Sequence, residues 1–377
     1  MYELLHAGFD TLDVAIAGAL PADTLKILEQ ARDEAAERQE PVLATIGNVD
    51  MHVSGHGMRG GYAFMTDTGP LGANWMIKHN TNKREWNIFA SPRATTLLAY
   101  GYQGTKDILW KELSNMGGHA TDHSVNRVDF AMDFRTKAFE LHHDQFVAHS
   151  HTKVTPHWGK HGTSDRNQPA AVVRGRRLES VTVGKQPGRQ VIVYDKLREA
   201  IERRKHFWFD TWGLDRHDPG AEVWRVEVRA GKKELKEKYA LRRFSDIEAG
   251  IGDVMVNALL EVRYLDDQQN DSNVSRQQLH PLWTHAQETI SRDLFAFRSG
   301  LTPGQVQEIT RDDAIRRYAT MLHASTLGLG IALGQDESMT AERLSAIAGR
   351  WVESEIHADQ QRHEKAVTRM RKRLHFV

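Results

Sequence analysis

The sequence predicts an α+β fold, with a mixed domain of strands and helices over residues 1–265 and an all-helical C-terminal domain over residues 266–377. Two features of the pattern predict this division. Short β-branched segments, separated by Gly, Pro and Asn turns, alternate with a few helices through the first part of the chain. After about residue 254, apolar residues recur at helical spacing instead. The 377 residues are enough for two or three domains.

The composition is that of an ordinary soluble protein and excludes several kinds of site. Basic and acidic residues number 50 each, so any affinity for nucleic acid must come from local patches rather than net charge. The absence of cysteine excludes thiolate nucleophiles, zinc–thiolate sites and disulfides, and it fits a reducing cytoplasm. No apolar run reaches the roughly 18 residues of a membrane span. The N-terminal stretch lacks a basic leader, so we expect no signal peptide and no membrane partner.

The elements of the first part follow from local patterns. A strand comes first, then an amphipathic helix, a meander of short strands, and a helix ended by two glycines. The segment from 135 to 175 fits no element, and we expect its His149 and His151 to lie in a solvated loop. Further along, a strand–turn–strand–helix unit precedes one more strand. We expect these elements at residues 9–18, 21–40, 62–91, 105–118, 181–205 and 222–231.

Two signals mark helix starts in the C-terminal domain. Thr302 followed by Pro303 is one, because proline is well accepted in the first helical turn. Thr310 with Asp313 is the other, as a variant of the capping box. The basic end "RMRKR" (residues 369–373) suits the C-terminus of a helix.

The segment "RVDFAMDF" (residues 127–134) alternates strictly between polar and apolar positions. In a strand, this alternation places Arg127, Asp129 and Asp133 on one face. The two carboxylates would lie about 13–14 Å apart, so both can ligate one ion only if the strand bends. Either could then be the main ligand of a metal ion. The alternative is a half-exposed strand with a solvated face.

The segment "VWRVEVRA" repeats this design, with Arg225, Glu227 and Arg229 on the polar face. A carboxylate between two arginines is normally held in its ionised form. Glu227 in this position is therefore either part of a surface ion pair or a metal ligand beside a phosphate site.

Tyr194 stands where the strand of "VIVYDKLREAIERR" gives way to a charged helix. The surrounding stretch, residues 174–205, is the richest in arginine and lysine, as expected of a surface that contacts phosphate backbones. Helical pairs such as Glu199 with Arg203 account for part of that charge. Tyr194 is therefore either a packing residue at a strand end or a reactive one.

A tyrosine in such a patch can attack a DNA phosphodiester, which leaves a covalent 5′-phosphotyrosine and a free 3′-hydroxyl. Because phenol is a weak nucleophile, the reaction calls for a divalent cation on the phosphate and for basic residues that stabilise the developing charge. Carboxylates on neighbouring strands supply the oxygen ligands that Mg²⁺ or Mn²⁺ prefers.

Four segments, in order from about Phe9 to Lys236, resemble the replication initiators of rolling-circle plasmids, filamentous phages and integrative elements. This family is called Rep_trans or replication initiation factor. Each segment alone is moderately specific, and their order strengthens the signal. The third lacks the serine usual in the family's glycine turn. The segments are "FDTLDVAIAG", "YGYQGTKDILWKELSNMGGHATDHSVNRVDFAMDF", "VTVGKQPGRQVIVYDK" and "EVWRVEVRAGKKEL".

The resemblance implies an antiparallel-sheet domain related to the HUH nucleases, in the cytoplasm of a bacterial host. It implies an enzyme that nicks and rejoins origin DNA with Mg²⁺ or Mn²⁺, and it places the attacking residue on Tyr194. The metal ligands then fall on Asp129, Glu227 and Asp133. The DNA-binding residues comprise the family's basic positions and three arginines of the basic segment: Arg127, Lys196, Arg225, Arg229, Arg189, Arg203 and Arg204.

The partners implied are double-stranded origin DNA and single-stranded DNA, with a host helicase and a second copy of the chain as further candidates. We expect the helical C-terminal domain to assist DNA binding, dimerisation or helicase recruitment rather than chemistry. Two other functions stay open: an initiator that binds the origin without cutting it, and a metal-dependent phosphodiesterase that uses water. In the phosphodiesterase, Tyr194 is merely structural.

Overall fold

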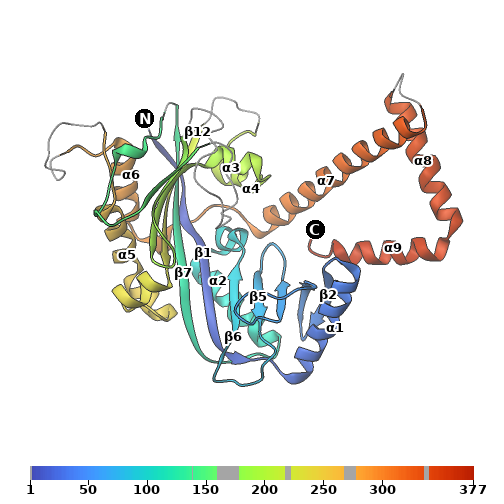
Figure 1. Ribbon diagram of the computed structural model, residues 1–377, viewed down its shortest axis with the longest axis horizontal. Coiled ribbons are helices and arrows are strands. Elements are labelled where there is room, and N and C mark those ends of the chain that lie inside the picture. The colour runs from blue at the N-terminus through green and yellow to red at the C-terminus, as the bar shows by residue number, and fades with distance from the viewer. Residues whose placement is uncertain (1, 138, 159–177, 217–221, 267–276, 335–338) are drawn as a thin grey trace.

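Eleven antiparallel strands form one sheet in the computed structural model, which describes residues 2–137, 139–158, 178–216, 222–266, 277–334 and 339–377. The long strands β1 (Glu3–Ala19) and β7 (His119–Thr136) pair at its centre and connect two groups of shorter strands (Figure 1). One flank continues through β6 (Trp86–Pro92), β5 (Ala73–Ile77), β4 (Phe64–Asp67), β3 (Val49–Val53) and β2 (Val42–Ile46). The other continues through β12 (Glu222–Gly231), β11 (Arg189–Asp195), β10 (Leu178–Gly184) and β9 (Val154–Trp158). The antiparallel sheet expected from the resemblance is confirmed.

Helices cover the apolar face of this sheet in two groups. On the flank of the shorter N-terminal strands lie α1 (Ala22–Arg38) and α2 (Ala94–Asn115), the latter kinked at Gly101. Behind β7, β12 and β11 lie α5 (Phe244–Glu261) and α6 (Pro281–Ile290). They bury the apolar side chains of β7 and β12 in one continuous core.

The short helices α3 (Lys196–Glu202) and α4 (Phe207–Trp212) lie instead on the polar face. A second apolar cluster holds them there, in which Trp208 and Trp212 pack with Val223 of β12 and Val306. The polar face is therefore covered at one end and left open beyond it. The remaining short elements are η1 (His143–Gln145), β8 (Phe146–Val147), η2 (Glu234–Lys238), β13 (Arg263–Tyr264) and η4 (Leu294–Ala296).

Three helices follow: α7 (Pro303–Ala332), α8 (Ala341–Ala358) and α9 (Gln360–Arg373). They run away from the sheet and turn back, so that the C-terminus lies beside the N-terminal strands (Figure 1). In the ranges that the structure describes, no helix is both long enough and apolar enough to cross a membrane.

The division between the two parts lies later than residue 265. Trp283 and Ile290 of α6, and Leu294 after it, are buried in the same core as the sheet. The helical extension therefore begins at Pro303, and the residues of the expected C-terminal domain up to about 297 belong to the α+β body. The pattern placed the division early because a helix that covers a sheet has the same spacing as one in a helical domain.

Most local expectations match the structure. The start at Thr302 is confirmed, since its side chain caps α7 in a capping box with Gln305. The start at Thr310 is wrong, because Thr310 lies inside α7 and its hydroxyl donates to the carbonyl oxygen of Val306. His149 and His151 are exposed in a loop, as expected.

Candidate active site

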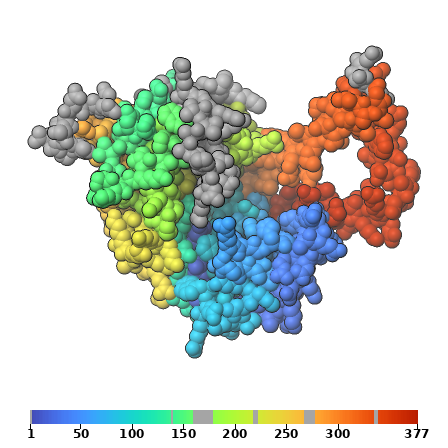
Figure 2. All heavy atoms as spheres, in the orientation of Figure 1, coloured from blue at the N-terminus to red at the C-terminus, as the bar shows by residue number. Residues whose placement is uncertain are grey.

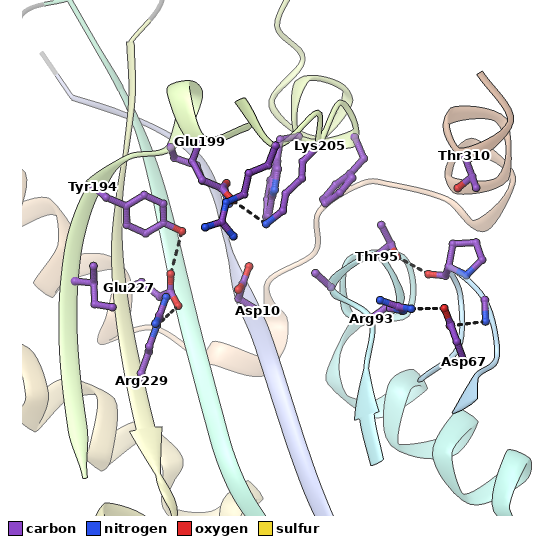
Figure 3. Close-up of a pocket in the computed structure, with 18 of the residues that line it drawn as sticks. Asp10, Asp67, Arg93, Thr95, Tyr194, Glu199, Lys205, Glu227, Arg229 and Thr310 are labelled. Carbon is purple, nitrogen blue, oxygen red and sulfur yellow. Dashed lines mark hydrogen bonds and ion pairs between the residues drawn. The ribbon is translucent and has the colours of Figure 1, made fainter. Parts of the chain in front are cut away.

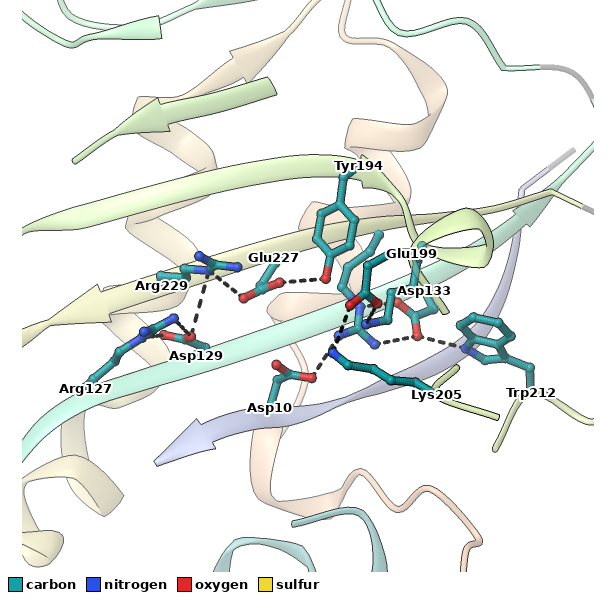
Figure 4. A network of polar contacts seen from close by, with 12 residues as sticks. Asp10, Arg127, Asp129, Asp133, Tyr194, Glu199, Lys205, Trp212, Glu227 and Arg229 are labelled. Carbon is teal, nitrogen blue, oxygen red and sulfur yellow. Dashed lines mark hydrogen bonds and ion pairs between the residues drawn. The ribbon is translucent and has the colours of Figure 1, made fainter. Parts of the chain in front are cut away.

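The polar face of the central strands holds a dense set of charged side chains. In the β7–β12 register, Asp133 pairs with Arg225, Asp129 with Arg229, and Ala131 with Glu227. Alternation turns all of these side chains to the same face. The small side chain of Ala131 leaves room for Glu227. The network that results is shown in Figure 4.

β1 contributes to the same face through a break in its register. The β1–β7 pairing shifts between Phe9 and Thr11, and Asp10 occupies the shift. Irregularities of this kind re-aim a side chain. Asp10 accepts a hydrogen bond of 2.8 Å from Arg225 Nη1. Burial alone would raise the pKa of Asp10, but the surrounding cations, Arg225 first and then Lys196 and Lys205, together hold that pKa below its usual range.

Arg225 and Asp133 form a buried ion pair at the centre of the network. Both side chains have 0% relative exposure, and Arg225 Nε and Nη2 donate to the two Asp133 oxygens at 2.6 and 2.8 Å. Trp212 Nε1 donates to the same carboxylate, and the Trp208 ring lies 4.2 Å from the Arg225 guanidinium. Despite burial, the ion pair lowers the pKa of Asp133.

Asp129 belongs to a neighbouring part of the network. It accepts a 2.9 Å hydrogen bond from Arg127 Nε, and its own side chain is fully buried. Burial raises the pKa of Asp129 to about 7, although Arg127 opposes the shift. Arg229 lies between Asp129 and Glu227, with its Nε 3.9 Å from the Asp129 carboxylate and 2.6 Å from Glu227 Oε1.

Tyr194 reaches this network from the end of β11. Its hydroxyl donates a hydrogen bond of 3.0 Å to Glu227 Oε2, and the residue is only 8% exposed. Burial, reinforced by the charge of Glu227, raises the pKa of Tyr194 well above its usual value. The phenol is therefore neutral and in contact with a carboxylate.

The change from strand to helix after Tyr194 has a local cause. Asp195 is the N-cap of α3, and its carboxylate accepts a 3.0 Å hydrogen bond from the backbone N–H of Arg198. Aspartate is among the best N-cap residues. The cap fixes the helix directly after the tyrosine, and it brings the first side chain of α3 to the same site.

That side chain, Lys196, is a buried cation beside the tyrosine. Its Nζ lies 2.7 Å from Glu199 Oε2, 4.6 Å from the centre of the Trp208 ring and 5.6 Å from the centre of the Tyr194 ring. Burial lowers the pKa of Lys196 to about 8. Lys205 also pairs with Glu199, at 2.8 Å. Two lysines therefore share one carboxylate next to Tyr194.

These groups open on a cleft of about 770 Å³ (Figure 3). One wall is the polar face with Tyr194 and Glu227, and the wall across from it comes from the β4–β5 turn and the start of α2. Arg93 pairs with Asp67 on that second wall. Basic side chains outnumber acidic ones along the cleft. The basic ones are Arg93, Lys196, Arg203, Lys205, Arg229 and Arg373, and the acidic ones are Asp10, Asp67, Glu199 and Glu227.

The expected DNA-binding residues lie in several different surroundings. Arg203, Arg229 and Lys196 line the cleft, whereas Arg225 is fully buried and cannot contact DNA without rearrangement. Arg189 lies on the other face of the sheet and pairs with Glu234 and Glu261. Arg127 binds Asp129, and Arg204 is exposed just beyond α3. The basic segment before residue 178 lies outside the described residues.

Sequence reasoning missed three contributors to the site: Asp10, His6 and Trp208. Asp10 depends on the register shift in β1, which no local pattern reveals. His6 packs against Trp208 at 5.5 Å between ring centres and is 6% exposed. The run "HFWFDTW" of α4 was the signal in the sequence that could have found Trp208. So many aromatic residues in a short polar region must pack against another part of the protein.

His6 gives a testable pH dependence of stability. Burial lowers the pKa of His6 to about 4, from 6.5. Between these values the unfolded chain binds more protons, so the free energy of unfolding should fall as pH drops from 6.5 to 4. At about 1.4 kcal/mol per pH unit, His6 should account for about 2–3 kcal/mol between pH 6.5 and 4.5.

Urea unfolding of the wild type and of His6→Phe should show a weaker pH dependence in the variant. His149→Phe, at an exposed loop position, is the matched control. Equal pH dependence in His6→Phe and the wild type would contradict the assignment.

The carboxylates expected to hold a metal ion are each bound by an arginine instead. Asp129 and Glu227 do lie on one face, but the Arg229 guanidinium occupies the space between them. The Asp133 carboxylate accepts hydrogen bonds from Arg225 and Trp212. In the part of the chain that the structure describes, no three His, Asp or Glu side chains form a group that could hold a metal ion. The residues as arranged do not fit a divalent cation.

No family model matches the chain, and no curated protein matches it. Among solved structures, the chain is similar to a rolling circle replication initiator protein from Geobacillus stearothermophilus. The TM-score is 0.40 and the identity 11%, over 78% of this chain and 99% of that one. A likeness of this degree assigns no residue and no activity to this chain.

Proposed function

We propose that the protein initiates rolling-circle replication by nicking and rejoining origin DNA through Tyr194. The observation that carries the proposal is the hydrogen bond from the Tyr194 hydroxyl to Glu227, inside a cleft with more basic than acidic side chains. The resemblance of four segments to the Rep_trans family adds support. A buried packing tyrosine would also need a partner for its hydroxyl, but it would not need the basic cleft beside it.

The chemistry follows from the contact between Tyr194 and Glu227. Because the pKa of Tyr194 is raised by burial, free phenolate is scarce and the proton must leave as the attack proceeds. Glu227 Oε2 accepts that proton while the phenol oxygen bonds to phosphorus. The bond from phosphorus to the 3′-oxygen breaks and that oxygen takes up a proton from solvent water, which leaves a 5′-phosphotyrosine and a free 3′-hydroxyl. Rejoining is the reverse transfer.

Cations beside the tyrosine match the charge that develops on the phosphate. Lys196, Lys205 and Arg229 lie within this part of the cleft, in surroundings where a fixed charge stabilises more than it does in water. Arg229 also contacts Glu227, since its Nε donates a hydrogen bond of 2.6 Å to Glu227 Oε1. The sequence predicts Mg²⁺ or Mn²⁺ as a cofactor, but binding it would require the arginines on Asp129, Asp133 and Glu227 to move aside, so the charge stabilisation proposed here comes from the basic side chains.

The proposal is tested by incubating the protein with supercoiled DNA of its own replicon, with Mg²⁺, with Mn²⁺ and with a chelator. We expect a nicked product whose 5′ end carries the protein and whose 3′ end is free. Nicking with a free 5′ end would support the metal-dependent phosphodiesterase instead. Loss of nicking in the chelator would support the predicted metal ion. Full nicking activity in the chelator would show that the reaction needs no metal ion.

Glu227→Gln keeps the size of the side chain but accepts a proton poorly. We expect nicking to slow by about a hundredfold, at the lower end of general-base effects, while affinity for DNA changes little. Single-turnover nicking rates and filter binding of the same DNA measure the two effects. Glu199→Gln, which changes a carboxylate of the same cleft that does not touch the tyrosine hydroxyl, is the comparison. An equal loss in both variants would assign Glu227 a general electrostatic role.

The second candidate is an initiator that binds the origin without cutting it. It is favoured by the pairing of Asp129, Asp133 and Glu227 with arginines, as expected of a rigid scaffold. It predicts origin binding with no strand break under any ionic condition.

A further inference from the structure

The C-terminal helices α7, α8 and α9 and the residues after them form an arm that we call the strap, described over residues 303–334 and 339–377. It is anchored at its start by apolar packing, since Leu301 and Val306 are buried in the cluster with Trp208. At its far corner, Ile347 of α8 is buried close to Gly330 of α7. The strap encloses an open window that is visible as a hole through the molecule in Figure 2.

The end of the strap returns to the N-terminal strands through polar contacts. Glu40, just after α1, pairs with Arg369 at 3.1 Å and Arg373 at 3.5 Å. Asp50 of β3 pairs with His375 at 2.8 Å. Next to these pairs, the backbone carbonyl of Lys372 lies 3.0 Å from His52 Nε2, and the Phe376 ring packs on His52 and Gly69.

Both ends of the strap line the cleft that holds Tyr194. Thr310 comes from the start of α7, and Arg373 and Phe376 come from the returning end. The two ends of the strap therefore meet at the cleft, and a strand that leaves the cleft between them would pass through the window. The basic end of α9, which the sequence pattern explains equally well as a helix terminus, supplies one of the cleft's cations.

We propose that a single DNA strand runs through the cleft and is enclosed by the strap, which opens at its C-terminal end to admit it. The inference rests on the proposed function for the identity of the strand as DNA. The strap then keeps the protein on the strand that carries the tyrosine linkage.

The two attachments differ in strength, and this difference defines which end opens. The start of the strap is held by buried apolar side chains. The returning end is held mainly by pairs whose side chains are partly exposed, and such pairs contribute only about 0–1 kcal/mol each. The polar end is therefore the one that releases, and release is favoured by salt.

A covalent lock at the polar end tests the enclosure. The chain has no cysteine, so Asp50→Cys with His375→Cys creates the two reactive thiols of the protein. The background carries Tyr194→Phe, so that no strand is cut. The protein is first bound to a closed single-stranded DNA circle at low salt, then joined with a short reducible bismaleimide and washed at high salt.

We expect the linked protein to stay on the circle and to leave when the DNA is linearised or the linker is reduced. His375→Cys alone cannot be linked, and it should wash off, as should the double variant without linker. A linked protein that washes off the circle as freely as the unlinked one would overturn the enclosure. Failure of the two cysteines to link at all would overturn the docking of the returning end.

A charge exchange at the other polar contact provides an independent measurement. Glu40→Arg should repel Arg369 and Arg373 and raise the dissociation rate from single-stranded circles by about tenfold, equivalent to about 1.4 kcal/mol. Adding Arg369→Glu, which lies outside the cleft, should restore part of the slow dissociation. No change in Glu40→Arg would count against the latch.

These results separate this inference from the proposed function. Trapping on the circle does not depend on nicking, so it can hold even when the wild type leaves DNA intact. Nicking without trapping on the circle would support the proposed function and contradict the enclosure of the strand by the strap. No binding to the circle at low salt would remove both.

Discussion

Tyr194→Phe should abolish nicking and the covalent adduct, with a loss of at least about ten-thousand-fold, while DNA affinity stays within a few-fold of wild type. The change removes only the hydroxyl that donates to Glu227 and keeps the ring beside Lys196. A nucleophile cannot be replaced by its neighbours, because no other group in that position can form the bond to phosphorus. Gel assays of nicking and filter binding of the same DNA measure the two effects.

The matched control is Tyr100→Phe, at an exposed position outside the cleft. It should nick and bind like the wild type. Peptide mapping of the trapped adduct by mass spectrometry should place the nucleotide on Tyr194. Near-normal nicking by Tyr194→Phe, or an adduct on Tyr239 or Tyr264, would show that Tyr194 is a packing residue.

Arg225→Met should lower the free energy of unfolding by about 3–5 kcal/mol at neutral pH. The substitution leaves the buried Asp133 carboxylate without its ion pair and removes a partner of Asp10. A buried charge left unpaired is costly because water no longer solvates it. Urea unfolding followed by circular dichroism measures the change.

The double variant Arg225→Met with Asp133→Leu separates this cause from lost packing. Because no unpaired charge remains on Asp133, much of the stability should return. Arg311→Met, whose pair with Glu308 is exposed at both ends, is the control and should change stability by less than about 1 kcal/mol. If Arg225→Met has the same free energy of unfolding as the wild type, the Arg225 ion pair does not stabilise the folded protein.

Local patterns predicted the strands and helices well where one face is buried. The alternation in "RVDFAMDF" defines β7 and separates its apolar side chains from Arg127, Asp129 and Asp133, as the structure has them. Only the ends differ, since β7 extends to His119 and Thr136. Pairing with β1 lengthens the strand beyond the residues whose own pattern requires it.

The site could be predicted only in its parts. Tyr194 and Glu227 were both selected, but their contact depends on the pairing of β11 with β12 and on the direction of each side chain. Asp10 enters from a register shift and Lys205 from the turn after α3. Arg189 belongs to the same basic segment as Lys196. The alternation of side chains along β11 nevertheless places Arg189 on the opposite face of the sheet.

The sequence by itself determined that strands with one charged face carry the candidate residues and that a helix starts directly after Tyr194, because alternation and capping act over a few residues. Tertiary structure alone decided which charges meet. An arginine placed across from a carboxylate by strand register satisfies it in the dry interior, and Arg229 thus lies where a metal ion was expected. The return of Arg373 to the cleft, over 300 residues from its partner Glu40, also depends on folding, since contacts at that separation leave no local pattern.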